Sequence, residues 1–141
     1  MVSKITSKQK KKGSLAIELL YQYCKDIEEW PGRWEIAEED LIVGESIKDQ
    51  FKLFLIDSIE KGRAKRTIKT YSSYLAALGG ELISRVNQDE SERSLLGDKL
   101  ILKYVDESGG PYWCHARDES EHDQYDSVCR QLFKFMMANS Q

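Results

Sequence analysis

The feature that most constrains the fold is the stretch from Gly44 to Val86, where apolar residues recur every three or four positions on both sides of a short basic turn. This spacing places apolar side chains on one face of a helix. Gly62 lies between the two series and can end the first helix in the left-handed conformation at little steric cost. Because the connection is short, the sequence predicts an antiparallel helical hairpin, with Phe51, Leu55, Leu75 and Leu78 in the core. The two apolar series are Ile47, Phe51, Phe54, Leu55 and Ile59, then Ile68, Tyr71, Leu75, Leu78, Leu82 and Val86.

Three further stretches outside the hairpin carry the same helical spacing. The first begins at Ser14 and includes Ile27, the second runs from Leu95 to Val105, and the third opens between Asp118 and Glu121. Each has an apolar stripe that must be buried. We therefore predict an all-α fold, a compact bundle of about five helices with the hairpin at its centre.

Two connections precede the hairpin. Trp30-Pro31-Gly32-Arg33-Trp34 is expected to break the first helix, with proline and glycine at the central positions of a type II turn. Its tryptophans could stack on nucleic-acid bases, but the surrounding acidic residues favour packing in the core. Residues 35–43 are expected to form an extended connection or one helical turn before Gly44.

The length of 141 residues predicts a single domain. We expect it to span residues 14–141, after a basic tail at 1–13 that is disordered because its like charges repel. No apolar run approaches the roughly 18 residues of a membrane span, so no membrane partner is predicted. The three cysteines have no framework spacing, which indicates reduced thiols and a cytoplasmic protein.

Positive charge is concentrated in two places. Residues 1–13 carry five lysines and no acid, and residues 61–71 carry five basic residues and no acid, whereas the net charge of the chain is −3. A protein that binds DNA over a broad surface is usually basic overall. Any phosphate contact is therefore expected to be local, at the tail or at the hairpin turn.

The hairpin resembles the first hairpin of the core-binding domain of tyrosine recombinases and phage integrases. That family has a helix rich in phenylalanine and leucine, then a Ser-x-x-Thr helix start with a tyrosine four residues after the threonine. Ala64 stands here in place of the capping serine. The resemblance covers mainly residues 44–86 and implies a small helical module that clamps DNA from one side, without the catalytic domain. It is carried by Phe51, Phe54, Leu55, Gly62, Arg63, Ala64, Lys65, Arg66, Thr67, Ile68, Tyr71, Leu75 and Leu78.

Two functions remain open at this stage. In the first, the protein is a DNA-binding module in which Arg63, Lys65, Arg66 and Lys69 contact phosphates from the start of a helix. In the second, it is a helical protein-interaction or scaffold domain whose basic turn is a solvated surface. The positions of the basic residues, which resemble the family pattern, favour the first function, and the net charge of −3 favours the second.

Catalytic and metal-binding signatures are weak. Cys114, His115, His122 and Cys129 are all metal-ligand types, but no pair has the spacing that presents two ligands from one turn. Adjacent Cys114 and His115 are expected to point apart, which disfavours a thiolate activated by a histidine. We predict no catalytic residues, no cofactor, no metal and no small-molecule substrate.

Overall fold

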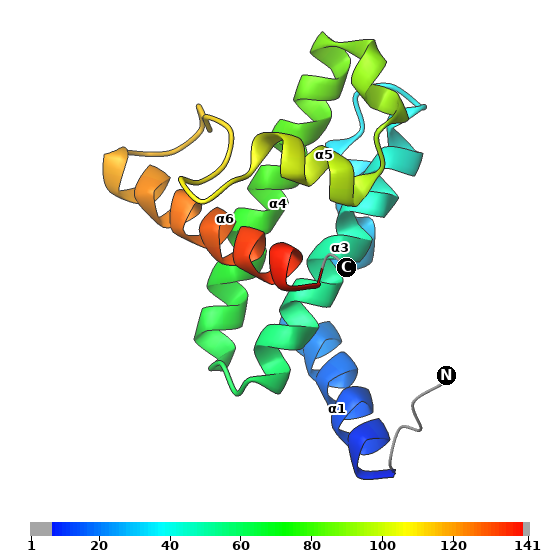
Figure 1. The fold of residues 1–141 in the computed structure, drawn as a ribbon, viewed down its shortest axis with the longest axis vertical. Helices are drawn as coiled ribbons and strands as arrows, with labels where there is room; N and C mark the ends of the chain where they lie inside the picture. Colours follow the sequence, from blue (N-terminus) through cyan, green and yellow to red (C-terminus); the bar gives the residue numbers. More distant parts are fainter. Residues whose placement is uncertain (1–6, 140–141) are drawn as a thin grey trace.

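The computed structural model describes residues 7–139, with side chains from residue 13 onward. Its six α-helices are α1 (Ser7–Tyr23), α2 (Trp30–Trp34), α3 (Asp40–Glu60), α4 (Lys65–Gln88), α5 (Gly97–Tyr104) and α6 (Glu119–Asn139). Two 3₁₀ helices are η1 (Ile27–Glu29) and η2 (Glu90–Ser94). Residues 7–139 contain no β-strand, apart from one isolated bridge between Asp106 and Gly109. The all-α prediction is confirmed (Figure 1).

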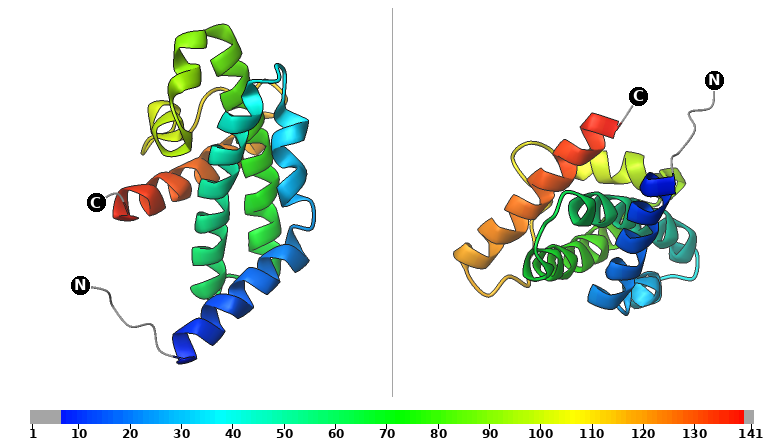
Figure 2. Two further views of the ribbon diagram at one scale, coloured as in Figure 1. Left: turned by 90° about the vertical axis from the view of Figure 1, so that its right-hand side faces the viewer. Right: turned by 90° about the horizontal axis from the view of Figure 1, so that it is seen from below.

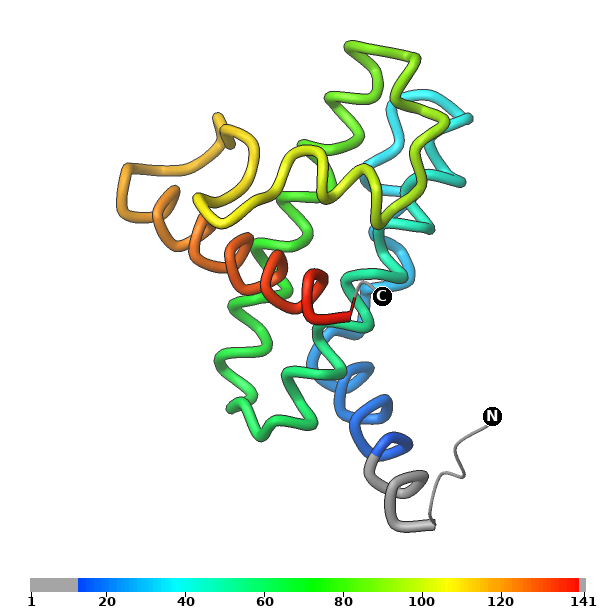
Figure 3. The backbone as a smooth tube through the Cα atoms, viewed as in Figure 1, coloured from blue at the N-terminus to red at the C-terminus, as the bar shows by residue number. Residues whose placement is uncertain are grey.

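The hairpin of α3 and α4 forms the middle layer of the molecule. α5 and α6 cover one of its faces, and α1 and α2 cover the other (Figure 2). The connection between α3 and α4 lies at one end of the hairpin, and the segment between α4 and α5 lies at its opposite end (Figure 3). The central antiparallel hairpin predicted from the apolar spacing is therefore present.

The core is built from the predicted apolar stripes. Phe51, Leu55, Leu75 and Leu78 are fully buried. Tyr125 on α6 is also fully buried and donates a hydrogen bond to the Pro111 carbonyl at 2.9 Å, so its polar tip is satisfied. Within residues 7–139, no helix combines the length and the apolar character that a bilayer span requires.

The segment predicted to be a type II turn is instead the short helix α2. Pro31 lies in the first turn of this helix, where its missing N–H is not needed. Trp30 and Trp34 are buried, which confirms that they pack in the core. The Trp34 indole donates a hydrogen bond to the Ala76 carbonyl at 2.8 Å, and its ring lies directly against Gly79 of α4.

Helix α3 begins at Asp40, so one helical turn precedes Gly44, which is one of the two alternatives predicted for residues 35–43. The buried Asp40 carboxylate accepts hydrogen bonds from the backbone N–H groups of Ile36 and Ala37, at 3.0 and 2.8 Å. It also accepts one from Asn87 Nδ2 at 2.9 Å and pairs with Arg93 at 3.2 Å. These partners fix the entry into α3 and satisfy a buried charge.

Two boundaries differ from the sequence-based prediction. α1 begins at Ser7, so residues 7–13 are helical where a disordered tail was expected; residues 1–6 lie outside the described part. Lysine favours helices, which is consistent with this earlier start. The sequence predicts that the helix containing Leu100 and Ile101 stops at Gly109-Gly110-Pro111, but α5 ends earlier, at Tyr104, because Asp106 and Gly109 close a tight turn.

Candidate nucleic-acid interface

The basic turn is shaped by the end of α3. Gly62 has a φ of +84°, the left-handed conformation that glycine adopts at little cost. Its N–H donates to the Ile59 carbonyl at 2.9 Å, and the Arg63 N–H donates to the Ser58 carbonyl at 3.1 Å. This pair of bonds is a Schellman motif, which ends the helix and turns the chain sharply. The predicted role of Gly62 is confirmed.

The start of α4 is positively polarised. Ala64 precedes the helix in an extended conformation with φ −64° and ψ 151°, and no side chain among the described residues caps the helix there. The first turn contains no acidic residue. The N-terminal end of a helix carries partial positive charge on its free N–H groups. Since no carboxylate or hydroxyl neutralises this end, it is suited to an anion from outside.

The four predicted cations surround this helix start. Arg63, Lys65, Arg66 and Lys69 are all exposed. Lys65, Arg66 and Lys69 line one open groove together with Thr70 and Ser73. Arg63 lies apart from them, in a pocket of about 300 Å³ that it shares with Lys61 and Lys134 among other residues. The structure therefore brings three of the four predicted residues onto one surface and places the fourth on another.

The positive charge that the turn can offer to an external anion depends on whether its cations are already paired with acids. Among residues 13–139, none of the four predicted side chains makes an ion pair with an acid. Lys65 instead lies over the Tyr23 ring, with its Nζ 5.6 Å from the ring centroid, which links the turn to the end of α1. Cations elsewhere in the described chain that do pair with carboxylates are Arg33, Lys48, Lys52, Lys61, Arg85, Arg93, Lys103 and Arg117.

Sequence reasoning missed Lys134 as a neighbour of the turn. It lies on α6, 71 positions after Arg63, and only the crossing of α6 over the hairpin brings the two residues to one pocket. No local pattern could have indicated this. The charge and the exposure of the four predicted cations, in contrast, could be predicted from the sequence.

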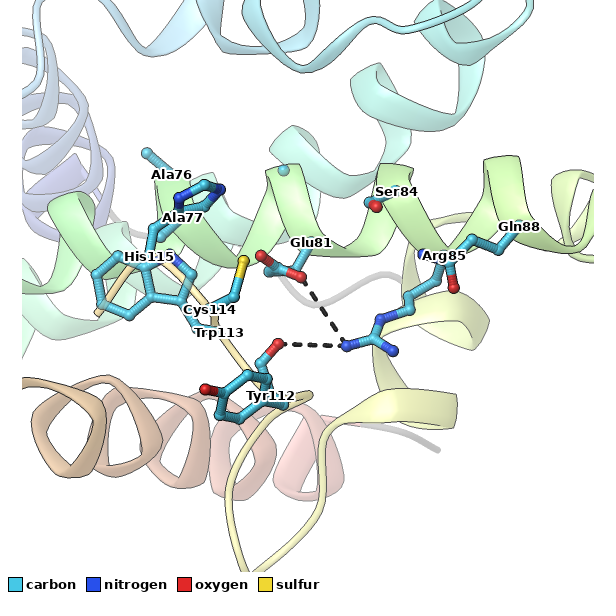
Figure 4. A pocket seen from close by; sticks show the side chains of 11 residues that line it. Ala76, Ala77, Glu81, Ser84, Arg85, Gln88, Tyr112, Trp113, Cys114 and His115 are labelled. Carbon is cyan, nitrogen blue, oxygen red and sulfur yellow. Dashed lines mark hydrogen bonds and ion pairs between the residues drawn. The ribbon is translucent and has the colours of Figure 1, made fainter. Parts of the chain in front are cut away.

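The four candidate metal ligands do not form one cluster. His122 accepts a hydrogen bond from the Trp113 N–H at 3.1 Å and contacts Asp126 through Nδ1, also at 3.1 Å. Cys129 is buried, and burial raises the pKa of its thiol to about 12, so the thiol stays protonated. His122 and Cys129 therefore have structural roles. Cys114 and His115, in contrast, lie together beside Glu81 of α4, which corrects the expectation that they point apart (Figure 4).

Comparisons of the chain with protein-family models, with curated proteins and with solved structures give no match.

Proposed function

We propose that the protein is a nucleic-acid-binding module that contacts the phosphate backbone with the start of α4. The observation that carries this proposal is the set of exposed cations, Arg63, Lys65, Arg66 and Lys69, that have no acidic partner among the described residues. Phosphates would supply the missing negative charge. Their oxygens would also accept hydrogen bonds from lysine, from arginine and from the N–H groups of an uncapped helix start.

An extended polyanion fits this surface better than a small anion. The groove along Lys65, Arg66 and Lys69 is shallow and open, whereas Arg63 and Lys134 lie in a separate pocket. Cations placed on two surfaces suit a chain of phosphates that passes the helix start. Phosphate contacts set position and carry no sequence information directly, so we expect binding to depend little on base sequence.

The resemblance of residues 44–86 to the core-binding domain of tyrosine recombinases supports the same assignment. In this proposal the hairpin faces DNA, and the chain has no cutting activity of its own. Ala64 leaves the start of α4 without a side-chain cap, and a phosphate oxygen could take the place of the hydroxyl that the family pattern carries there.

Binding to fluorescently labelled duplex DNA, measured by anisotropy over a range of salt concentrations, tests the proposal. Each neutralised phosphate contributes a slope of about −0.9 to log K against log salt, so four contacts give roughly −3 to −4. Arg66→Gln should reduce the magnitude of the slope by about one unit. Lys99→Gln is the matched control, because Lys99 is an exposed cation on α5, away from the turn, and its removal should leave the slope unchanged.

The lysines near the N-terminus need a separate control. Replacing Lys4, Lys8, Lys10, Lys11 and Lys12 with glutamine removes that charge and leaves the turn intact. Loss of all binding in this variant would show that these lysines are the anchor. The proposal fails if no duplex binds even at low salt, or if removing the charges of Arg63, Lys65, Arg66 and Lys69 together leaves the slope unchanged.

We propose a protein-interaction domain as the second candidate. The observation in its favour is a set of exposed apolar side chains around the start of α3. Ile36 and Ile42 are 64% and 74% exposed, and Leu41 lies between them in sequence at 38%. Protein-binding surfaces are typically contiguous exposed apolar patches, and these three side chains would contribute to one. Failure of the salt experiment would leave this as the function to test.

A further inference from the structure

A pocket of about 490 Å³ lies between α4 and the segment that precedes α6. One wall is formed by α4, including Gly80, Glu81 and Arg85, and the other by residues 112–115 (Figure 4). This pocket is distinct from the basic groove at the start of α4. It contains the donor atoms of three different metal-ligand types.

The three donors are a Glu81 carboxylate oxygen, the Cys114 sulfur and a His115 ring nitrogen. All of them lie within 4.8 Å of one another. In a tetrahedral zinc site with ligands at 2.0–2.3 Å from the metal, two ligand atoms are about 3.3–3.8 Å apart. The donors therefore need to approach one another by only about 1 Å to hold an ion.

The segment that carries Cys114 and His115 is fixed in position by its neighbours. Arg85 donates a hydrogen bond to the Tyr112 carbonyl at 3.2 Å. The Trp113 N–H donates to His122, and the Trp113 ring packs against Tyr125 at 5.2 Å between centroids. These contacts join the segment to α4 on one side and to α6 on the other. They position the backbone next to Cys114 and His115 before the metal arrives.

We propose that Glu81, Cys114 and His115 form a Zn²⁺ site whose fourth position opens into the pocket. Carboxylate, thiolate and imidazole are all ligands of zinc, and the mixture of oxygen, sulfur and nitrogen donors disfavours Mg²⁺ and Ca²⁺, which prefer oxygen. Three protein ligands with one position left for water or an external ligand is the arrangement of zinc sites that are open to solvent. Cys114 binds as the thiolate, so its thiol proton is released to solvent when the ion enters.

Cobalt substitution tests the site, because Co²⁺ bound to a thiolate gives a sulfur-to-metal charge-transfer band in the near ultraviolet. The experiment uses the full chain without a histidine tag and without nucleic acid. We expect a band that saturates at one Co²⁺ per chain and disappears when Zn²⁺ is added in equal amount. Cys114→Ser should abolish the band, and His115→Gln and Glu81→Gln should each weaken binding by at least about tenfold.

Two control variants separate a specific site from general loss of structure. Cys24→Ala removes a buried thiol that the pocket does not contain, and Glu119→Gln removes an exposed carboxylate at the start of α6. Both should bind Co²⁺ as the unmodified chain does, and circular dichroism should show the same helix content in all variants. The proposal is overturned if Co²⁺ binds to saturation without a charge-transfer band, or if the band is unchanged in Cys114→Ser. It is also overturned if Co²⁺ at one equivalent per chain does not bind.

Discussion

Gly79→Ala tests how closely α2 packs against the hairpin. An ideal Cβ at position 79 would lie 2.1, 2.4 and 2.5 Å from Cζ2, Cε2 and Cη2 of Trp34, far inside van der Waals contact. The ring has little room to move, because it is 8% exposed and packs edge-on against Phe51 at 6.0 Å between centroids. Trp34 must therefore shift, or α2 must move away from α4.

The change in the free energy of unfolding caused by Gly79→Ala combines one stabilising and two destabilising contributions. Alanine in a helix is favoured over glycine by about 1 kcal/mol. Overpacking a core costs about 1–3 kcal/mol, and a displaced Trp34 indole would also lose its hydrogen bond to Ala76, worth about 1 kcal/mol. We expect Gly79→Ala to lower the free energy of unfolding by about 1–3 kcal/mol, measured by urea denaturation.

Gly80→Ala is the matched control in the same helix. The nearest atom to its added Cβ is Trp34 Cδ1 at 3.7 Å, an ordinary contact, so this variant should gain about 0.5–1 kcal/mol. Trp34→Phe removes the outer part of the ring that meets the new Cβ. Gly79→Ala should therefore cost much less in the Trp34→Phe background. Equal effects of Gly79→Ala and Gly80→Ala would refute the close approach of α2 to α4.

Two further predictions concern the core and the surface charges. Leu75→Ala should lower the free energy of unfolding by about 2–5 kcal/mol, since the side chain is fully buried, and a value near zero in urea denaturation would contradict its place in the core. Hydrogen bonds from Lys48, Lys52 and Tyr21 lower the pKa of Glu28 from 4.5 to about 2. Ionised Glu28 therefore contributes fully to the free energy of unfolding above about pH 4.5, and this contribution is lost as the pH falls toward 2. The difference in the free energy of unfolding between the unmodified protein and Glu28→Gln should close over that range. A difference that stays constant from pH 6 to pH 2 would show that these contacts do not form.

The parts of the fold that depend on local spacing could be predicted from the sequence. The apolar stripes of α3 and α4 identified Phe51, Leu55, Leu75 and Leu78 as core residues, because a helical period is a property of neighbouring positions. Helix α2 could not be predicted in the same way. Pro31 and Gly32 are compatible with a type II turn and with the first turn of a helix, and the packing of Trp34 on Gly79 selects the helix.

In the candidate sites too, local features could be predicted from the sequence, whereas neighbours from distant positions could not. Arg63, Lys65, Arg66 and Lys69 are visible in the sequence as a run of charge, but their lack of acidic partners among residues 13–139 depends on where the nearby carboxylates lie. Cys114 and His115 were recognised as ligand types, whereas Glu81 precedes Cys114 by 33 positions on another element. Sequence spacing reveals ligands that share one turn, and it does not reveal ligands that meet only after folding.

The hydrogen bonds of Asp40 have a consequence for how the molecule opens. Its carboxylate joins the loop before α3, the end of α4 at Asn87, and η2 through Arg93. Because the departure of any one of these segments removes hydrogen bonds from a buried charge, we expect them to separate from the protein together. Native-state hydrogen exchange should then report one cooperative unit at this end of the hairpin, with the amides of Ile36 and Ala37 sharing a single opening free energy. Asp40→Asn would keep the shape of the side chain, remove the charge, and let the loop exchange independently of η2.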